Sequence, residues 1–216
     1  MTESQWFACR QPRTMLEFLR PRASARRLRL FGCACCRQLW SLIEVEPCRH
    51  AIEVGERFAL GQASEAERAR AATGAHPHRD HDPICSAAWR CAILHHDDVQ
   101  NANMIATLAA LTAHNNTEAA AQTVLLREIF GNPFRPVSID PTWLSWQAGT
   151  VVRIARRVRD EGRWEDLPIL ADALEEAGCN VPGLLEHFRQ PGLHVLGCWA
   201  LDLVSGDDAS SLPPPS

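Results

Sequence analysis

Apolar residues recur at steps of three and four positions along much of this chain, which is the spacing of one face of an α-helix. The segment that follows Ser24 shows the pattern clearly, because Leu28, Phe31, Cys35 and Leu39 fall on one stripe. No run of alternating apolar and polar residues is long enough to build a sheet. The pattern therefore predicts a mainly α protein, a compact multi-helix domain without a substantial sheet.

Residue types that favour helix ends mark where these helices should begin. Ser24, Ser64 and Asp140 belong to the types that cap helix N-termini, and Glu67 stands three positions after Ser64, as in a capping box. Asp166 is expected to cap a helix in the same way. We expect helices over residues 25–43, 47–60, 65–73, 118–130, 151–160, 167–178 and 193–204, with one or two more between residues 84 and 114.

The length of 216 residues is ample for a hydrophobic core. We expect one helical domain over residues 1–206, with a histidine-rich loop inserted at about residues 74–83. The last ten residues, 207–216, are rich in proline and serine and have little to bury, so this tail is predicted to be disordered.

Composition narrows the cellular setting and the partner classes. No apolar run approaches the roughly 20 residues needed to span a bilayer, and the N-terminal stretch lacks the pattern of a secretory signal. These features favour a cytoplasmic protein, in which the nine cysteines should be reduced thiols. A formal net charge of −4 argues against a dedicated nucleic-acid binder.

The densest candidate chemistry is the stretch HPHRDHD, in which His76, His78, Asp80 and His81 could converge on a zinc-like ion. Cys85, from the following helix, could complete the set. As a string, the stretch also matches the HxHxDH signature of the metallo-β-lactamase fold. That fold places the motif directly after a buried strand, whereas a helical segment precedes it here. The alternative is that the histidines are solvated loop residues with no metal.

Two further groups of residues could form a metal or catalytic site, and each can also be explained by ordinary packing. Cys33 and Cys36 lie one helical turn apart, but within an apolar stripe, where free cysteines commonly pack as small hydrophobic residues. His194, Cys198 and Asp202 fall at four-residue intervals on the expected helix 193–204, as a nucleophile and base could. No oxyanion donor is evident, so a histidine–aspartate contact around a packed cysteine is favoured there.

Arginines crowd the start of the first long helix, where the helix dipole disfavours positive charge. Arg22, Arg26, Arg27 and Arg29 could bind phosphate or an acidic partner, and a second set near residues 153–159 could extend that surface. The alternative is compensation within the molecule.

Several longer stretches carry a resemblance. The segments FGCACCRQLW, REIFGNPFRPV, LPILADALEEAGC and HVLGCWALDL resemble an uncharacterised bacterial paralogous family expanded in some GC-rich genomes. The similarity covers about the first sixty residues and residues 125–206. The family implies no activity, and it marks the histidine loop as a local elaboration of a helical frame.

Taken from the residues, the favoured function is a cytoplasmic helical protein-interaction or adaptor module, and no catalytic residue is assigned. The alternatives are a metal-binding protein or metal-dependent hydrolase that uses the histidine loop, and a phosphate or nucleic-acid binder that uses the arginines. No cofactor is required by the first interpretation, and zinc is the cofactor implied by the second.

Overall fold

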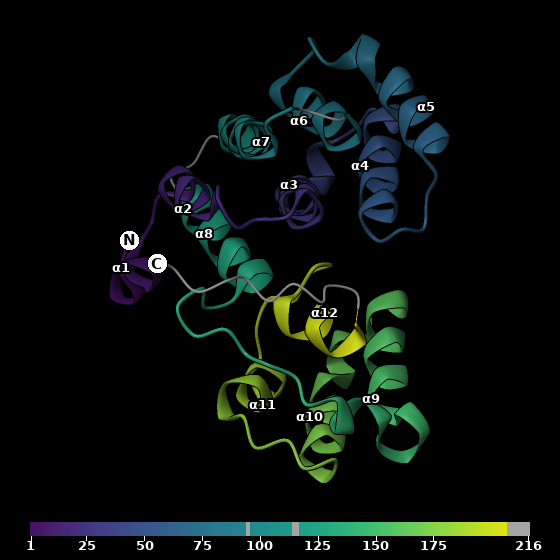
Figure 1. Cartoon of the computed structure of the whole chain (residues 1–216). Helices are drawn as coiled ribbons and strands as arrows, with labels where there is room; N and C mark the ends of the chain where they lie inside the picture. The colour runs from purple at the N-terminus through teal and green to yellow at the C-terminus, as the bar shows by residue number, and fades with distance from the viewer. Residues whose placement is uncertain (94–95, 114–116, 207–216) are drawn as a thin grey trace. The chain divides into compact units, whose positions relative to one another are not determined.

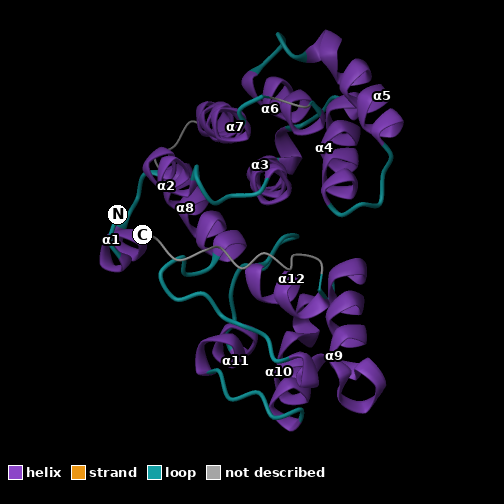
Figure 2. Cartoon of the chain, in the orientation of Figure 1, coloured by secondary structure: helices purple, strands orange, loops and turns teal. Residues whose placement is uncertain are grey.

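The computed structural model describes residues 1–93, 96–113 and 117–206, and every regular element in these ranges is helical (Figures 1 and 2). The mainly α class predicted from the sequence is confirmed. The predicted disordered tail, residues 207–216, lies outside the described residues. The α-helices are α1 Glu3–Ala8, α2 Pro12–Leu19, α3 Ala25–Gln38, α4 Glu46–Ala59, α5 Glu65–Ala75, α6 Pro83–Ala92, α7 Asp98–Ala113, α8 Thr117–Phe130, α9 Pro141–Glu161, α10 Leu167–Glu176, α11 Pro182–Arg189 and α12 Trp199–Ser205.

Contacts between residues divide the chain into two compact units, Met1–Ile129 and Phe130–Ser216, called unit 1 and unit 2 below. That residues 1–206 fold as one domain stays a prediction. None of the described helices combines the length and apolarity needed to cross a membrane.

In unit 1, helix α3 packs against α4, α6 and α7, and α4 also packs against α5 and α6. The predicted stripe of α3 is buried, with Leu28 and Phe31 at 3% and 0% exposure. Helices α4 and α6 cross closely at Gly55, where a Cβ atom would lie 2.8 Å from the backbone oxygen of Cys91. This crossing positions the cysteines of α3 and α6 in the core.

Three of the predicted helix N-caps are confirmed. Ser24 accepts a hydrogen bond from the backbone of Arg27, and Ser64 forms a full capping box with Glu67. Asp140 caps α9. The prediction that Asp166 caps α10 is wrong, because its carboxylate pairs with Arg163 at 2.9 Å and makes no cap hydrogen bond.

The C-terminal end of α6 is held by arginines from two other helices. Arg29 donates to the backbone oxygens of Cys91 and Ile93, and Arg68 donates to that of Ala92. The last carbonyls of a helix lack partners within it and carry partial negative charge, so cationic donors suit them. Backbone carbonyls thus compensate the charge of Arg29, one of the arginines of α3.

In unit 2, helices α9, α10, α11 and α12 surround one core that includes Val151, Leu170 and Phe188. Helix α9 is interrupted, because Trp146 is extended and residues 147–149 have left-handed backbone angles. Gln147 and Ala148 are the two residues other than glycine with positive φ, at 44° and 56°, in the described ranges. The side chain of Arg153 donates to the backbone oxygen of Ala148 next to this break.

The expected helix over residues 193–204 is shorter than predicted. Helix α12 begins only at Trp199, and residues 190–195 form no regular element. Pro191 and Gly192 precede the segment and Gly197 lies within it, so the apolar residues between them form an irregular connection and a turn. His194, Cys198 and Asp202 therefore do not share one helix face.

Candidate metal centre

Three potential metal ligands come together where α11 is connected to α12. His187 lies in the last turn of α11, His194 lies in the connection, and Cys198 is the residue that precedes α12. A turn in which the backbone nitrogen of Cys198 donates to the oxygen of Val195, at 3.0 Å, brings the thiol back toward α11. The whole set lies within residues 187–198 of unit 2.

The geometry of this group suits a tetrahedral ion. The Nε2 atom of His187 lies 3.2 Å from the Sγ atom of Cys198. One ligand atom from each of His187, His194 and Cys198 lies within 4.8 Å of the others. Zinc bonds of about 2.3 Å to sulfur and 2.0 Å to nitrogen, at the tetrahedral angle, separate the two ligand atoms by about 3.5 Å. The observed spacing needs little rearrangement to admit an ion.

Aromatic rings surround the two imidazoles. The indole of Trp164 stacks on the ring of His194, with centroids 6.4 Å apart at 29°. His187 contacts the rings of Phe188 and Trp199, with centroids 5.8 Å and 5.2 Å away. Cys198 is 1% exposed, whereas both histidines are half-buried. The thiol is thus buried, and the two imidazoles are partly accessible.

The chemistry of this set depends on protonation. A thiolate and two neutral imidazoles are good ligands for zinc, and each must lose or lack a proton to bind. Without an ion, the same atoms form a thiol–imidazole hydrogen bond. An ion would also fix a connection that has no regular secondary structure. A fourth ligand would decide between the two classes of zinc site, since a protein side chain makes the site structural and water makes it catalytic.

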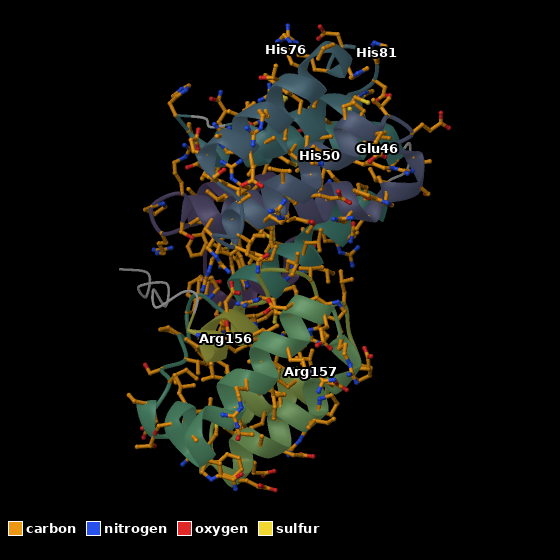
Figure 3. The ribbon with its side chains drawn as sticks, turned by 90° about the vertical axis from the view of Figure 1, so that its right-hand side faces the viewer. Glu46, His50, His76, His81, Arg156 and Arg157 are labelled. Atoms are coloured by element: carbon orange, nitrogen blue, oxygen red, sulfur yellow. The ribbon has the colours of Figure 1, made fainter. Side chains whose placement is uncertain are left out.

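The histidine loop, which carries the predicted metal site, is placed differently. His78 and His81 lie side by side, with ring centroids 5.4 Å apart, while His76 packs against Trp89. The side chain of Asp80 is 83% exposed. Figure 3 shows His76 and His81 at one end of unit 1.

Cys85, the fifth predicted ligand, is directed into the core. It is 1% exposed, and burial raises the pKa of its thiol. The acid at the end of the loop, Asp82, is used to cap α6 through a 2.8 Å hydrogen bond from the backbone of Cys85. Cys85 is therefore a core residue, and zinc binding by the loop stays a prediction.

The cysteines of α3 are core residues, as favoured from the sequence. Cys33 and Cys36 are 1% and 0% exposed, and the sulfur of Cys36 lies 3.8 Å from that of Cys91. Burial raises the pKa of Cys35 well above its ordinary value. Protonated, packed thiols explain the composition of this stripe without a metal.

The four arginines proposed as a phosphate site do not form one separate surface. Arg22 donates to the backbone oxygen of Phe18 and lies over its ring, while Arg27 is 5% exposed. Arg29 holds the end of α6, and Arg26 is half-buried. Phosphate binding by this set stays a prediction, with intramolecular compensation now visible for Arg22 and Arg29.

The arginines of unit 2 are also engaged within the chain. Arg156 donates to the backbone oxygen of Ser205, and Arg157 pairs with Glu161 at 3.1 Å. Figure 3 shows both arginines on α9. Arg156 and Arg157, which were expected to extend a basic surface, thus each have a partner within the chain.

Sequence reasoning missed His187. It sits alone in the segment LLEHFRQPG, and the assumed helix 193–204 directed attention to residues at four-residue spacing. The available signal was the local order His187, His194 and Cys198, three potential ligands separated by a proline and two glycines that let the chain turn back.

No protein-family model, no curated protein and no solved structure matches this chain. The family resemblance drawn from the sequence segments therefore stays a prediction.

Proposed function

We propose that this chain is a metal-binding protein whose ion, of the zinc class, is held by His187, His194 and Cys198. The observation that carries the proposal is the approach of one sulfur and two imidazole nitrogens to within 4.8 Å of one another. Nitrogen and sulfur ligands in this combination favour zinc over magnesium or calcium, which prefer oxygen. The metal alternative considered from the sequence is kept, and its ligands move from the histidine loop to unit 2.

The aromatic shell supports a bound ion. Trp164 lies against the ring of His194 and Trp199 against that of His187, which favours imidazoles that are held in place before an ion arrives. Apolar surroundings also raise the strength of a metal–thiolate bond by limiting water access. Both effects favour tight binding of one ion at one place.

The test is metal analysis of protein purified without a histidine tag, followed by zinc titration of the metal-free form. We expect one equivalent of zinc, and at a hundred times the dissociation constant the ion should raise the free energy of unfolding by about 2.7 kcal/mol. Cys198→Ser and His194→Asn should each lose most of that increase. Cobalt added in place of zinc should give a thiolate charge-transfer band that Cys198→Ser abolishes.

The matched control is the triple variant His76→Ala, His78→Ala, His81→Ala, which removes three histidines from unit 1. It should bind zinc as the natural chain does. If the triple variant loses zinc while Cys198→Ser keeps it, the ion belongs to the histidine loop and this proposal is wrong.

A protein-binding role is the second candidate, and exposed apolar side chains in unit 1 favour it. Phe7, Leu111 and Val124 are 53%, 56% and 46% exposed. If they serve a partner rather than the fold, Leu111→Gln and Val124→Gln should each change the free energy of unfolding by no more than about 0.5 kcal/mol. A loss of several times that amount in urea denaturation would show that they stabilise the chain itself.

A further inference from the structure

Unit 1 contains a surface hollow that the metal proposal does not use. It has a volume of about 460 Å³ and lies between the N-terminal part of α4 and the C-terminal half of α5. Its lining residues are Glu46, Pro47, His50, Arg70, Ala71 and Gly74. The volume falls within the range of small-molecule sites in proteins.

The helix register explains why polar groups face this hollow. Glu46 and His50 are four residues apart on α4, and Arg70 and Gly74 are four residues apart on α5, so each pair shares a helix face. Pro47 and the buried Ala71 supply the apolar part of the lining. Figure 3 shows Glu46 and His50 on α4.

The charged groups of this hollow are not paired with each other. Glu46, His50 and Arg70 are exposed, and within the part of unit 1 that the structure describes none of them forms a hydrogen bond or an ion pair. A carboxylate and a guanidinium that line one hollow, yet stay too far apart for an ion pair, leave room for a ligand between them. Such a ligand needs a cationic group for Glu46 and an anionic group for Arg70.

We infer that this hollow binds a small zwitterion of the short-peptide class, with a free amino group and a free carboxylate. The amino group donates to the carboxylate of Glu46, and the carboxylate accepts from the guanidinium of Arg70. His50, which also lines the hollow, can hydrogen-bond the intervening peptide group. A single small amino acid would fill only part of the volume, which favours a dipeptide. This inference concerns unit 1 and is independent of the metal site.

The test follows the backbone amides of Ala71 and Gly74 by NMR in the full chain while alanylalanine is added. For a ligand of this size in an open site, we expect a dissociation constant of about 1 mM. N-acetylation and C-terminal amidation of the dipeptide should each weaken binding about tenfold, because each removes one charge-assisted hydrogen bond.

Variants assign each end of the ligand. Arg70→Gln should bind the dipeptide and its amide equally weakly, and Glu46→Gln should do the same for the dipeptide and its acetylated form. The matched controls are Arg10→Gln and Glu44→Gln, which change exposed residues outside the hollow and should bind as the natural chain does.

A variant that fills the hollow tests the location of the ligand without changing any charge. A Cβ atom added at Gly74 meets no heavy atom within 4 Å, so Gly74→Leu should fold normally and block the hollow. Unchanged binding in Gly74→Leu would overturn the inference. So would an absence of amide shifts at ten times the expected dissociation constant, or inorganic phosphate binding as tightly as the dipeptide, which would show a plain anion site.

Discussion

The guanidinium group of Arg29 lies 2.5 Å from the backbone oxygen of Cys91, to which it donates a hydrogen bond. The two residues are on different helices, so the bond ties the start of α3 to the end of α6. It also places a positive charge at a helix C-terminus, where the dipole favours it, although the same charge is disfavoured at the start of its own helix. The arginine-rich start of α3 is therefore compensated in part by backbone.

The first prediction concerns this tie. Arg29→Met keeps an apolar stem but leaves the carbonyl oxygens of Cys91 and Ile93 without their charged donor. We expect the free energy of unfolding to fall by about 1.5–3 kcal/mol, the range for hydrogen bonds to charged groups. Urea denaturation measures it. Arg10→Met, an exposed change, should stay within about 0.5 kcal/mol, and an equal loss in both variants would contradict the role of Arg29.

The second prediction separates a steric clash from backbone strain at two glycines of unit 2. Gly131 and Gly162 have φ of 65° and 66°, a conformation that disfavours alanine by about 1–2 kcal/mol. A Cβ atom at Gly131 would also lie 2.9 Å from Cγ of Trp199, whereas one at Gly162 meets nothing within 4 Å. Gly131→Ala should therefore cost about 1–3 kcal/mol more than Gly162→Ala in thermal or urea unfolding. Equal losses would mean that the Trp199 side chain moves aside without cost.

The third prediction concerns thiol reactivity. Cys9 is partly exposed and the other cysteines are buried. Burial raises the pKa of Cys48, as it does that of Cys35, and so lowers the fraction of reactive thiolate. Under native conditions a thiol reagent should label Cys9 rapidly and the buried cysteines only as the chain opens, as mass spectrometry of timed samples can show. Fast labelling of Cys36 would contradict its place in the core.

The fourth prediction is a pH dependence from the capping box of α5. The backbone and side chain of Ser64 donate to Glu67, both at 2.8 Å, and they hold the pKa of that carboxyl below its usual range. A folded-state pKa below the unfolded one stabilises the protein above the ordinary glutamate pKa, and this stabilisation is lost as pH falls through the lowered value.

Glu67→Gln should therefore lower the free energy of unfolding near neutral pH, and the difference from the natural chain should shrink on acidification. Urea titrations across the acidic range measure this, with Glu44→Gln as a baseline. A difference that stays constant, or grows toward low pH, would contradict the assigned sign.

Much of the fold could be predicted because its signals are local. Ser24 and Ser64 stand beside amphipathic stripes, and both begin helices as expected. Where a side chain had two possible partners, the sequence could not decide between them. Asp166 could accept from the backbone at the start of α10 or pair with Arg163, and the structure shows the pair with Arg163.

The candidate metal site was harder to predict, because it depends on how a segment without regular structure turns. The stretch from Leu193 to Gly197 has the apolar content of a helix, and only the fold shows that it forms a connection and a turn. That turn brings Cys198 to His187, a pair eleven positions apart with no helical or strand periodicity between them. Periodicity therefore predicted most helices of unit 2 and missed the metal-ligand group that these helices position.

The interrupted helix α9 shows that this sequence is not the most stable one for its own backbone. Gln147 and Ala148 hold left-handed angles that cost about 1–2 kcal/mol each for residues with a Cβ atom. At Ala148 the usual ranking of helix formers should be reversed: Ala148→Gly should raise the free energy of unfolding by about 1 kcal/mol, where the same change within a regular helix lowers it. Stability could thus be engineered into this protein at a position where most design rules would forbid the substitution.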